Sequence, residues 1–141
     1  MDKPRPYLIA ALFCESIIEE KNSSLTVVRI ADRIDVQTEG LPEGVKPMIQ
    51  VKGLVSLKSG PVVGEFQLKI KVTVPSGGTK EITAFPIKLL GNDQGQNTII
   101  HMSLGVEEDG LYWFHVLFED DELTRIPLML VRSVRQAGLK V

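Results

Sequence analysis

Residues 66–74 have the sequence FQLKIKVTV, in which apolar and polar side chains alternate strictly. The apolar positions are Phe66, Leu68, Ile70, Val72 and Val74. Successive side chains of a β-strand point to opposite faces, so this alternation predicts a strand with one buried and one solvated face. The sequence Pro-Ser-Gly-Gly follows at residues 75–78. It predicts a turn, because glycine accepts the positive φ that such turns need.

Short apolar runs separated by polar or glycine-containing turns recur along the rest of the chain. Upstream, Val51, Val55 and Leu57 fall on alternate positions and so on one face of an expected strand. Downstream, Ile87 and Leu89 do the same. Pro86 interrupts the downstream run, and a proline has no N–H for the ladder, so we expect an edge strand or a bulge there. The rhythm predicts an all-β fold, an immunoglobulin-like antiparallel β-sandwich of about eight strands.

Two segments are less regular. Residues 7–18 fit either a strand or a helical stripe, and we favour a strand because nearly every later segment is one. In residues 25–36 the apolar phase includes Asp32. Either Asp32 is buried beside Arg29 or Arg33, or a bulge turns its side chain away, and we favour the bulge.

The composition indicates a single globular domain. The chain has 141 residues, with 43% hydrophobic residues and a formal net charge of -2. We expect one domain over residues 1–141, with its core in about residues 6–134 and a short C-terminal tail at 135–141. No apolar run is long enough for a membrane span, and no basic face favours nucleic acid. Cys14 is the only cysteine, which fits a reducing compartment, so we expect a cytoplasmic protein with no membrane partner.

The most specific local motif precedes the apolar run at residues 113–118. Glu108, Gly110 and Tyr112 are spaced as in the tyrosine corner of immunoglobulin-like sandwiches, where the tyrosine hydroxyl returns to upstream backbone. We therefore expect Tyr112 to be buried, with its hydroxyl bonded to the backbone of residues 107–109. A plain hairpin is the alternative, because Gly-x-Tyr also begins unrelated strands.

Three stretches together resemble a bacterial family of small, uncharacterised β-sandwich proteins. They are YLIAALFCE at residues 7–15, VVRIADRI at 27–34 and GLYWF at 110–114. The resemblance covers about residues 6–134. It implies a bacterial, cytoplasmic β-sandwich with a strand at its start. The family has no assigned activity, so no catalytic residues follow from it.

The sequence offers no convincing catalytic site. Cys14 lies in an apolar run, where a thiol behaves as a small hydrophobe. Residues 76–80, SGGTK, lack the spacing and the following helix of a phosphate loop. His101 and His115 are the only histidines, and they have no evident third metal ligand. We therefore expect no enzyme, no cofactor and no metal site.

Acidic turns suggest one alternative function. Glu19, Glu20, Asp93 and residues 119–122 fall on alternate turns, which lie at the same end of an antiparallel sandwich. Clustered carboxylates there would suit Ca²⁺, as in a calcium- or lipid-dependent C2-like module. Acidic residues are also ordinary turn residues. An enzyme with an unrecognised site is the other alternative.

The favoured function is a non-catalytic binding or assembly module that uses an apolar sheet face. The run at residues 111–118 and the segment 126–131 are apolar on both phases, as is the start of the chain from Tyr7 to Cys14. We expect these three strands to lie side by side in one sheet and to expose a patch that needs a cover. A second copy is the simplest cover, giving a dimer, although a different protein could use the same face. Trp113 is the expected anchor. The expected interface residues are Leu111, Trp113, His115, Leu117, Met129 and Val131.

Overall fold

The computed structural model describes residues 4–133, which form nine β-strands and no helix. The expected number of about eight strands is therefore too low. The expected tail, residues 135–141, lies outside the described residues. The strands are β1 (Tyr7–Glu19), β2 (Leu25–Ala31), β3 (Arg33–Gln37), β4 (Met48–Lys58), β5 (Val63–Thr73), β6 (Thr79–Leu90), β7 (Gly95–Gly105), β8 (Gly110–Phe118) and β9 (Asp121–Ser133).

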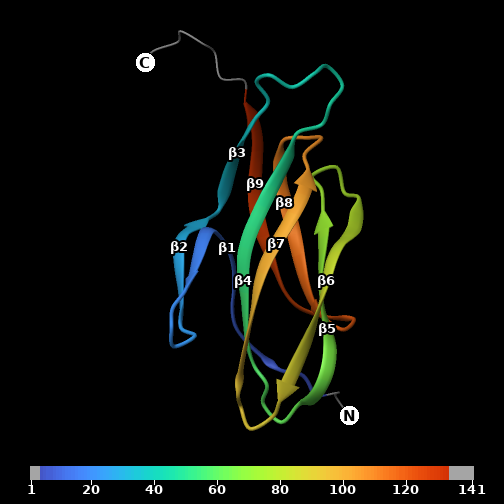
Figure 1. The fold of residues 1–141 in the computed structure, drawn as a ribbon. Helices are drawn as coiled ribbons and strands as arrows, with labels where there is room; N and C mark the ends of the chain where they lie inside the picture. The colour runs from blue at the N-terminus through green and yellow to red at the C-terminus, as the bar shows by residue number, and fades with distance from the viewer. Residues whose placement is uncertain (1–3, 134–141) are drawn as a thin grey trace.

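The strands form two sheets (Figure 1). Sheet A has the order β2-β1-β4-β7, and sheet B has the order β3-β9-β8-β5-β6. Strands β3 and β9 pair in parallel, and the other paired strands are antiparallel. Strands β8 and β9 therefore lie in sheet B, whereas β1 lies in sheet A. The expectation that these three strands share one sheet is wrong.

The core lies between the two sheets. As the alternation of residues 66–74 predicts, β5 buries Leu68, Ile70 and Val72. The rings of Phe13 in sheet A and Phe114 in sheet B meet edge to face, with centroids 4.9 Å apart. This contact is the geometry that aromatic pairs prefer, and it ties β1 to the opposite layer.

Two local predictions are confirmed. Residues 7–18 form a strand rather than a helix, since they lie within β1. Pro86 lies in β6, which is an edge strand of sheet B, so its missing N–H costs no ladder hydrogen bond inside the sheet.

Asp32 marks the point where the chain changes sheets. Strand β2 ends at Ala31 in sheet A, and β3 begins at Arg33 in sheet B. Asp32 is exposed between them, and its carbonyl oxygen accepts a hydrogen bond from the N–H of Met129 at 3.1 Å. The expected single strand with a bulge is therefore wrong, and so is the alternative of a buried Asp32. Asp32 interrupts the apolar alternation because β2 ends at Ala31, and a new strand with its own alternation begins at Arg33.

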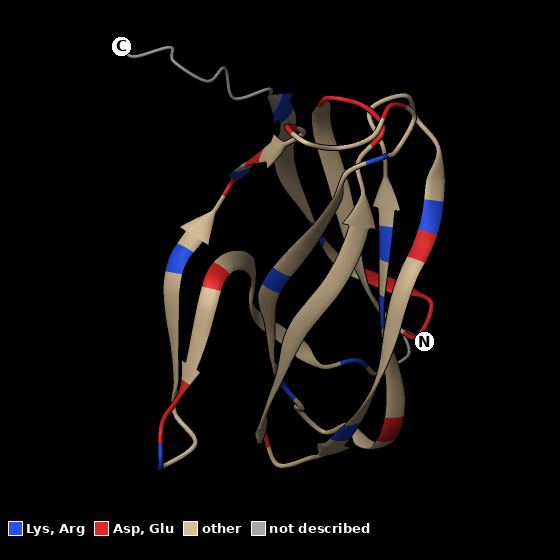
Figure 2. Cartoon of the chain, turned by 45° about the horizontal axis from the view of Figure 1, so that its top comes forward, with Lys and Arg blue, Asp and Glu red and all other residues tan. Residues whose placement is uncertain are grey.

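A two-stranded arm, residues 15–31, projects from sheet A (Figures 1 and 2). Strand β1 pairs with β4 only as far as Cys14, opposite Lys52, and it pairs with β2 from Phe13 onward. Strand β1 is the only strand with which β2 makes an extensive contact in residues 4–133. The arm therefore consists of the last third of β1, the turn that follows, and β2.

Gly53 allows β1 to lie close to β4. It stands directly opposite Phe13 in the register, at a buried position. A Cβ atom on Gly53 would lie 2.4 Å from the carbonyl oxygen of Leu12 and 2.9 Å from Cδ1 of Phe13. Only glycine leaves room for the Phe13 ring at this point of the core.

Candidate functional site

The expected interface residues lie side by side on sheet B, but they form a smaller apolar surface than predicted. Leu111 stands opposite Met129, and Trp113 stands opposite Pro127. Leu111 is 37% exposed and Leu117 only 8% exposed. Trp113, His115, Met129 and Val131 are half-buried.

A cation covers the expected anchor. The guanidinium carbon of Arg125 lies 5.3 Å from the ring centroid of Trp113. This distance is within the range of a cation–π interaction, so Arg125 occupies a face of the indole that a partner would otherwise contact. Strand β1, which was expected to extend this surface, belongs to the other sheet.

His115 belongs to a chain of polar side chains on the same face of sheet B. Its Nε2 lies 2.8 Å from Oγ1 of Thr73, which in turn lies 2.8 Å from Oγ1 of Thr79. Its Nδ1 bonds to Oε1 of Glu122. The order hydroxyl, imidazole, carboxylate is that of a catalytic triad. The resemblance is limited to the order of these three side chains, and Thr73 stands at the end of β5 in register with Thr79 of β6 and Trp113 of β8.

The two histidines do not share a site. His101 lies on β7 in sheet A, and His115 lies on β8 in sheet B. The acidic turns do not gather either. Within residues 4–133, no group of three or more His, Cys, Asp or Glu side chains is placed to hold a metal ion. Asp120 pairs instead with Lys69 at 3.2 Å.

Tyr112 has the position and the hydrogen bond that the sequence predicts. It is 1% exposed, and its hydroxyl donates to the carbonyl oxygen of Glu108 at 2.7 Å. Burial raises the pKa of the Tyr112 hydroxyl, which therefore stays protonated and able to donate. Gly110 has a φ of 139°, and a Cβ there would lie 2.9 Å from Cγ of Pro75. The spacing of Glu108, Gly110 and Tyr112 thus has a steric and a hydrogen-bonding cause.

Further contacts fix the loop before Tyr112. Oε1 of Glu108 accepts the N–H of Ser76 at 2.6 Å. Oδ1 of Asp109 accepts both the backbone N–H and the Nε–H of Arg132, at 2.8 and 2.9 Å. These bonds, the backbone bond first, lower the pKa of Asp109. Glu107 pairs with Lys46 at 2.8 Å, which lowers the pKa of Glu107.

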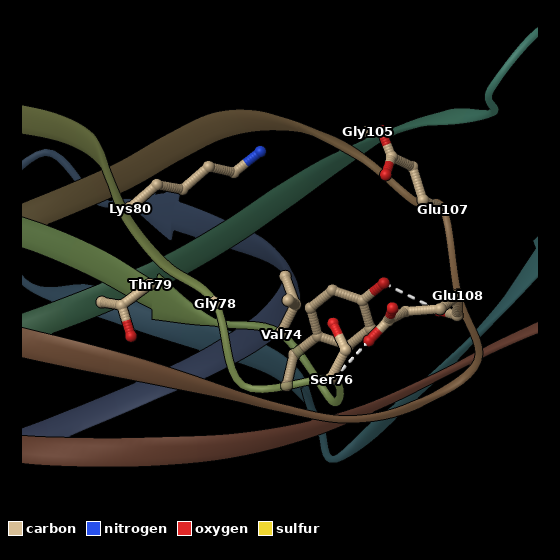
Figure 3. Close-up of a pocket in the computed structure, with 9 residues that line it drawn as sticks. Val74, Ser76, Gly78, Thr79, Lys80, Gly105, Glu107 and Glu108 are labelled. Carbon is tan, nitrogen blue, oxygen red and sulfur yellow. Dashed lines mark hydrogen bonds between the residues drawn. The ribbon is translucent and has the colours of Figure 1, made fainter.

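A hollow of about 250 Å³ opens beside this loop (Figure 3). Val74, Tyr112, Lys80 and Glu107 are among the residues that line it. It also includes Ser76, Gly78 and Thr79 from the SGGTK segment. The segment forms the turn between β5 and β6, as expected, and is followed by a strand rather than a helix. The hollow is open, and its carboxylates already have partners, so it has the character of a surface depression.

The outer face of sheet A carries five of the eleven large hydrophobic side chains that are exposed in residues 4–133. We define this face by the residues that alternate with core residues such as Phe13, Val55 and Ile100. Leu12, Leu54 and Ile99 stand in one cross-strand row of it, and Ile30, Cys14 and Lys52 stand in the next. Its large exposed hydrophobic residues are Tyr7, Ile18, Ile30, Met48 and Ile99.

The exposure on this face is high for apolar side chains. Ile30 is 69% exposed, and Met48 is 61% exposed. Leu54 points outward but is 8% exposed, because Leu12 and Ile99 flank it. Sequence analysis missed this face. The signal was present in β1, which is apolar on both phases, but that strand was assigned to the wrong sheet.

Cys14 lies on the outer face of sheet A without acting as a nucleophile. It is 6% exposed, beside Lys52. Burial raises the pKa of its thiol more than the charge of Lys52 lowers it. The thiol therefore remains protonated at neutral pH, and a protonated thiol is a poor nucleophile.

Comparisons with known proteins show a likeness of fold only. No family model and no curated protein matches the sequence. A beta-glucosidase from Listeria innocua, solved in complex with glucose, matches 92% of this chain at 8% identity, with a TM-score of 0.53. Beta-glucosidase 3B from Thermotoga neapolitana matches 58% at 12% identity, with a TM-score of 0.45. The alkylpurine DNA glycosylase AlkC from Pseudomonas fluorescens matches 57% at 15% identity, with a TM-score of 0.41.

The matched region is a small part of each of those proteins. This chain covers 17%, 14% and 25% of their respective lengths. The likeness to the Listeria innocua protein therefore establishes a shared arrangement of strands and assigns no activity.

Within residues 4–133, no helix is long and apolar enough to cross a membrane.

Proposed function

We propose that this chain is a non-catalytic binding or assembly module of a bacterial cytoplasm. Its binding surface is the outer face of sheet A together with the arm, residues 15–31. The partner is a protein or a second copy of the chain, with no role for nucleic acid, membrane or cofactor. The one cysteine and its protonated thiol are compatible with a reducing compartment.

One observation carries the proposal. Ile18, Ile30 and Ile99 expose much of their surface on the face that holds the row of Leu12, Leu54 and Ile99, and Met48 is exposed further along β4, beyond the polar pair of Gln50 and Ser103. Scattered exposed hydrophobic residues are normal on a protein surface, but an apolar row with several exposed isoleucines on the same face favours an interaction site. The Trp113 surface on sheet B is the weaker candidate, since Arg125 already covers its anchor.

We also infer that the fold is an immunoglobulin-like sandwich. The arm is an insertion at the point where the chain passes from sheet A to sheet B, between β1 and β3. Two features support this inference. The chain passes from β1 in sheet A to β3, which pairs in parallel with β9 in sheet B. Tyr112 stands at the start of β8 with its hydroxyl bonded back to Glu108, as in a tyrosine corner.

Affinity purification from the native host tests the binding surface. The tagged variants are the wild type, Ile99→Glu on sheet A and Leu111→Glu on sheet B, which are partly exposed positions on opposite faces. We expect the same protein to co-purify with the wild type and with Leu111→Glu, and to be lost with Ile99→Glu. Circular dichroism confirms that each variant is folded. A partner that is retained by all three, or lost only with Leu111→Glu, contradicts the assignment.

A further inference from the structure

We propose that two copies of this chain exchange arms, so that the arm of each copy packs across the outer face of sheet A of the other. The proposal rests on the binding function above and names its partner. It predicts a two-fold dimer in which the same surfaces of both copies are used.

The arm leaves part of its apolar surface uncovered within residues 4–133. Ile17 and Val27 are half-buried on one side of the hairpin, whereas Ile18 and Ile30 are exposed on the other. Strand β2 packs extensively on β1 alone among the described strands. An isolated two-stranded hairpin is marginally stable in water and needs a further layer against one of its faces. The arm therefore requires a cover, and the fold leaves it free to find one outside.

The outer face of sheet A offers a cover of matching character. Its central row, Leu12, Leu54 and Ile99, is wholly apolar and crosses all three of the strands paired there. Sheets that pack face to face bury such rows about 10 Å apart. An arm laid on this row places Ile18 and Ile30 of one copy against Ile99 of the other.

Charge favours a second copy over an arbitrary apolar partner. Lys52 and Lys58 are the only Lys, Arg, Asp or Glu side chains on the outward phase of the paired parts of β1, β4 and β7. Neither lysine forms an ion pair with a carboxylate in residues 4–133. Both lie on β4, so the face that the arm would cover is positively charged.

The arm carries the complementary charge. Its tip contains Glu19, Glu20 and Lys21, which leaves it net negative. Glu20 shares the phase of Ile18, and its Oε1 accepts the hydroxyl of Thr26 at 3.1 Å, so its carboxylate lies on the same side as the exposed isoleucines. Arg29 is already paired with Glu15 at 2.8 Å. The surface of the arm and the face of sheet A are therefore both apolar and carry opposite charges. Because every copy of the chain has both surfaces, a second copy can supply the matching one.

A charge exchange between the two surfaces gives a direct test. The arm variant carries Glu19→Lys and Glu20→Lys, and the face variant carries Lys52→Glu and Lys58→Glu. Sedimentation equilibrium at tens of micromolar measures the mass and the dissociation constant. We expect a wild-type dimer, and dimers at least about tenfold weaker for each variant alone, because both contacts of each homodimer become like-charged.

Mixing the two variants should restore the dimer. In the mixed dimer the lysine arm meets the glutamate face, and the wild-type arm meets the wild-type face, so both contacts are again complementary. Glu39→Lys with Glu43→Lys, in the loop between β3 and β4, makes the same charge change away from both surfaces and should leave the dimer unchanged.

Two results would overturn the proposal. One is a monomeric wild type at this concentration, and the other is a dimer that neither variant weakens. If the wild type is monomeric but Ile99→Glu loses a host partner that Leu111→Glu keeps, the arm exchange fails while the binding function stands. If Ile99→Glu also changes nothing, both fail.

Discussion

The hydroxyl of Tyr112 lies 2.7 Å from the carbonyl oxygen of Glu108, four residues earlier in the chain. The bond closes the loop that joins β7 in sheet A to β8 in sheet B. Tyr112 itself is buried, so its hydroxyl has no access to bulk water as an alternative partner. A buried polar group of this kind stabilises a fold only while its partner is in place.

Replacing Tyr112 by phenylalanine should therefore lower the free energy of unfolding by about 1 kcal/mol, because the carbonyl of Glu108 loses its donor. Chemical denaturation of the wild type and of Tyr112→Phe measures the difference. Tyr7→Phe is the matched control, because Tyr7 is the other tyrosine and is exposed. Equal stabilities of wild type and Tyr112→Phe would show that this hydrogen bond does not hold the loop.

Gly53→Ala should destabilise the protein by about 1 to 3 kcal/mol, the cost of overpacking a filled core. The added methyl group would lie 2.4 Å from the carbonyl oxygen of Leu12, so β1 and β4 must separate or Phe13 must move. Gly95→Ala serves as the control, because its Cβ would meet nothing nearer than Nζ of Lys58 at 3.5 Å. Thermal unfolding compares the two, and a Gly53→Ala protein as stable as Gly95→Ala would contradict the close approach.

The ion pair of Asp109 with Arg132 should make stability depend on pH in the acid range. The folded pKa of Asp109 lies below its ordinary value of 3.8, so the stabilisation is fully present above that value. It is lost as the pH falls through the lower folded pKa, because the carboxylate then takes up a proton. We expect Asp109→Asn to be less stable than the wild type at neutral pH, with the difference shrinking below pH 3.8.

Unfolding curves at a series of pH values give this comparison. Asp93→Asn, at an exposed turn position, controls for the loss of a charge. A difference between wild type and Asp109→Asn that stays constant from neutral to acid pH would mean that Asp109 gains nothing from Arg132.

Excess Ca²⁺ or Zn²⁺ should leave the melting temperature at its value in chelator. The carboxylates of Asp120 and Glu122 have partners in Lys69 and His115, and the two histidines lie in different sheets. A ligand at a hundred times its dissociation constant would stabilise the folded state by about 2.7 kcal/mol. A reproducible upward shift of several degrees with either ion would therefore reveal a site that these contacts do not suggest.

Local features could be predicted from the sequence because their causes are local. The alternation of residues 66–74 depends only on the geometry of a strand, and Leu68, Ile70 and Val72 are buried as expected. The hydrogen bond of Tyr112 depends on a spacing of four residues. Pro86 marks an edge strand because a proline has no N–H to donate to a strand on its other side.

The pairing of distant strands could not be predicted in the same way. Strand β1 is apolar on both phases, which shows that both of its faces meet apolar surroundings but not which strands lie beside it. Its partners are β2 and β4, chosen by contacts such as Phe13 with Gly53 that are far apart in sequence. The covering of Trp113 by Arg125 was missed for a similar reason, since it depends on the side chains of two different strands.

A photo-reactive amino acid at position 99 tests most directly whether the outer face of sheet A is the binding surface. The variant is expressed in the native host, irradiated, and compared with one carrying the same residue at position 111 on sheet B. We predict a defined protein adduct from position 99, at the mass of two chains if arms are exchanged, and none from position 111. Adducts from position 111 alone, or from neither position, would contradict the assignment of this face.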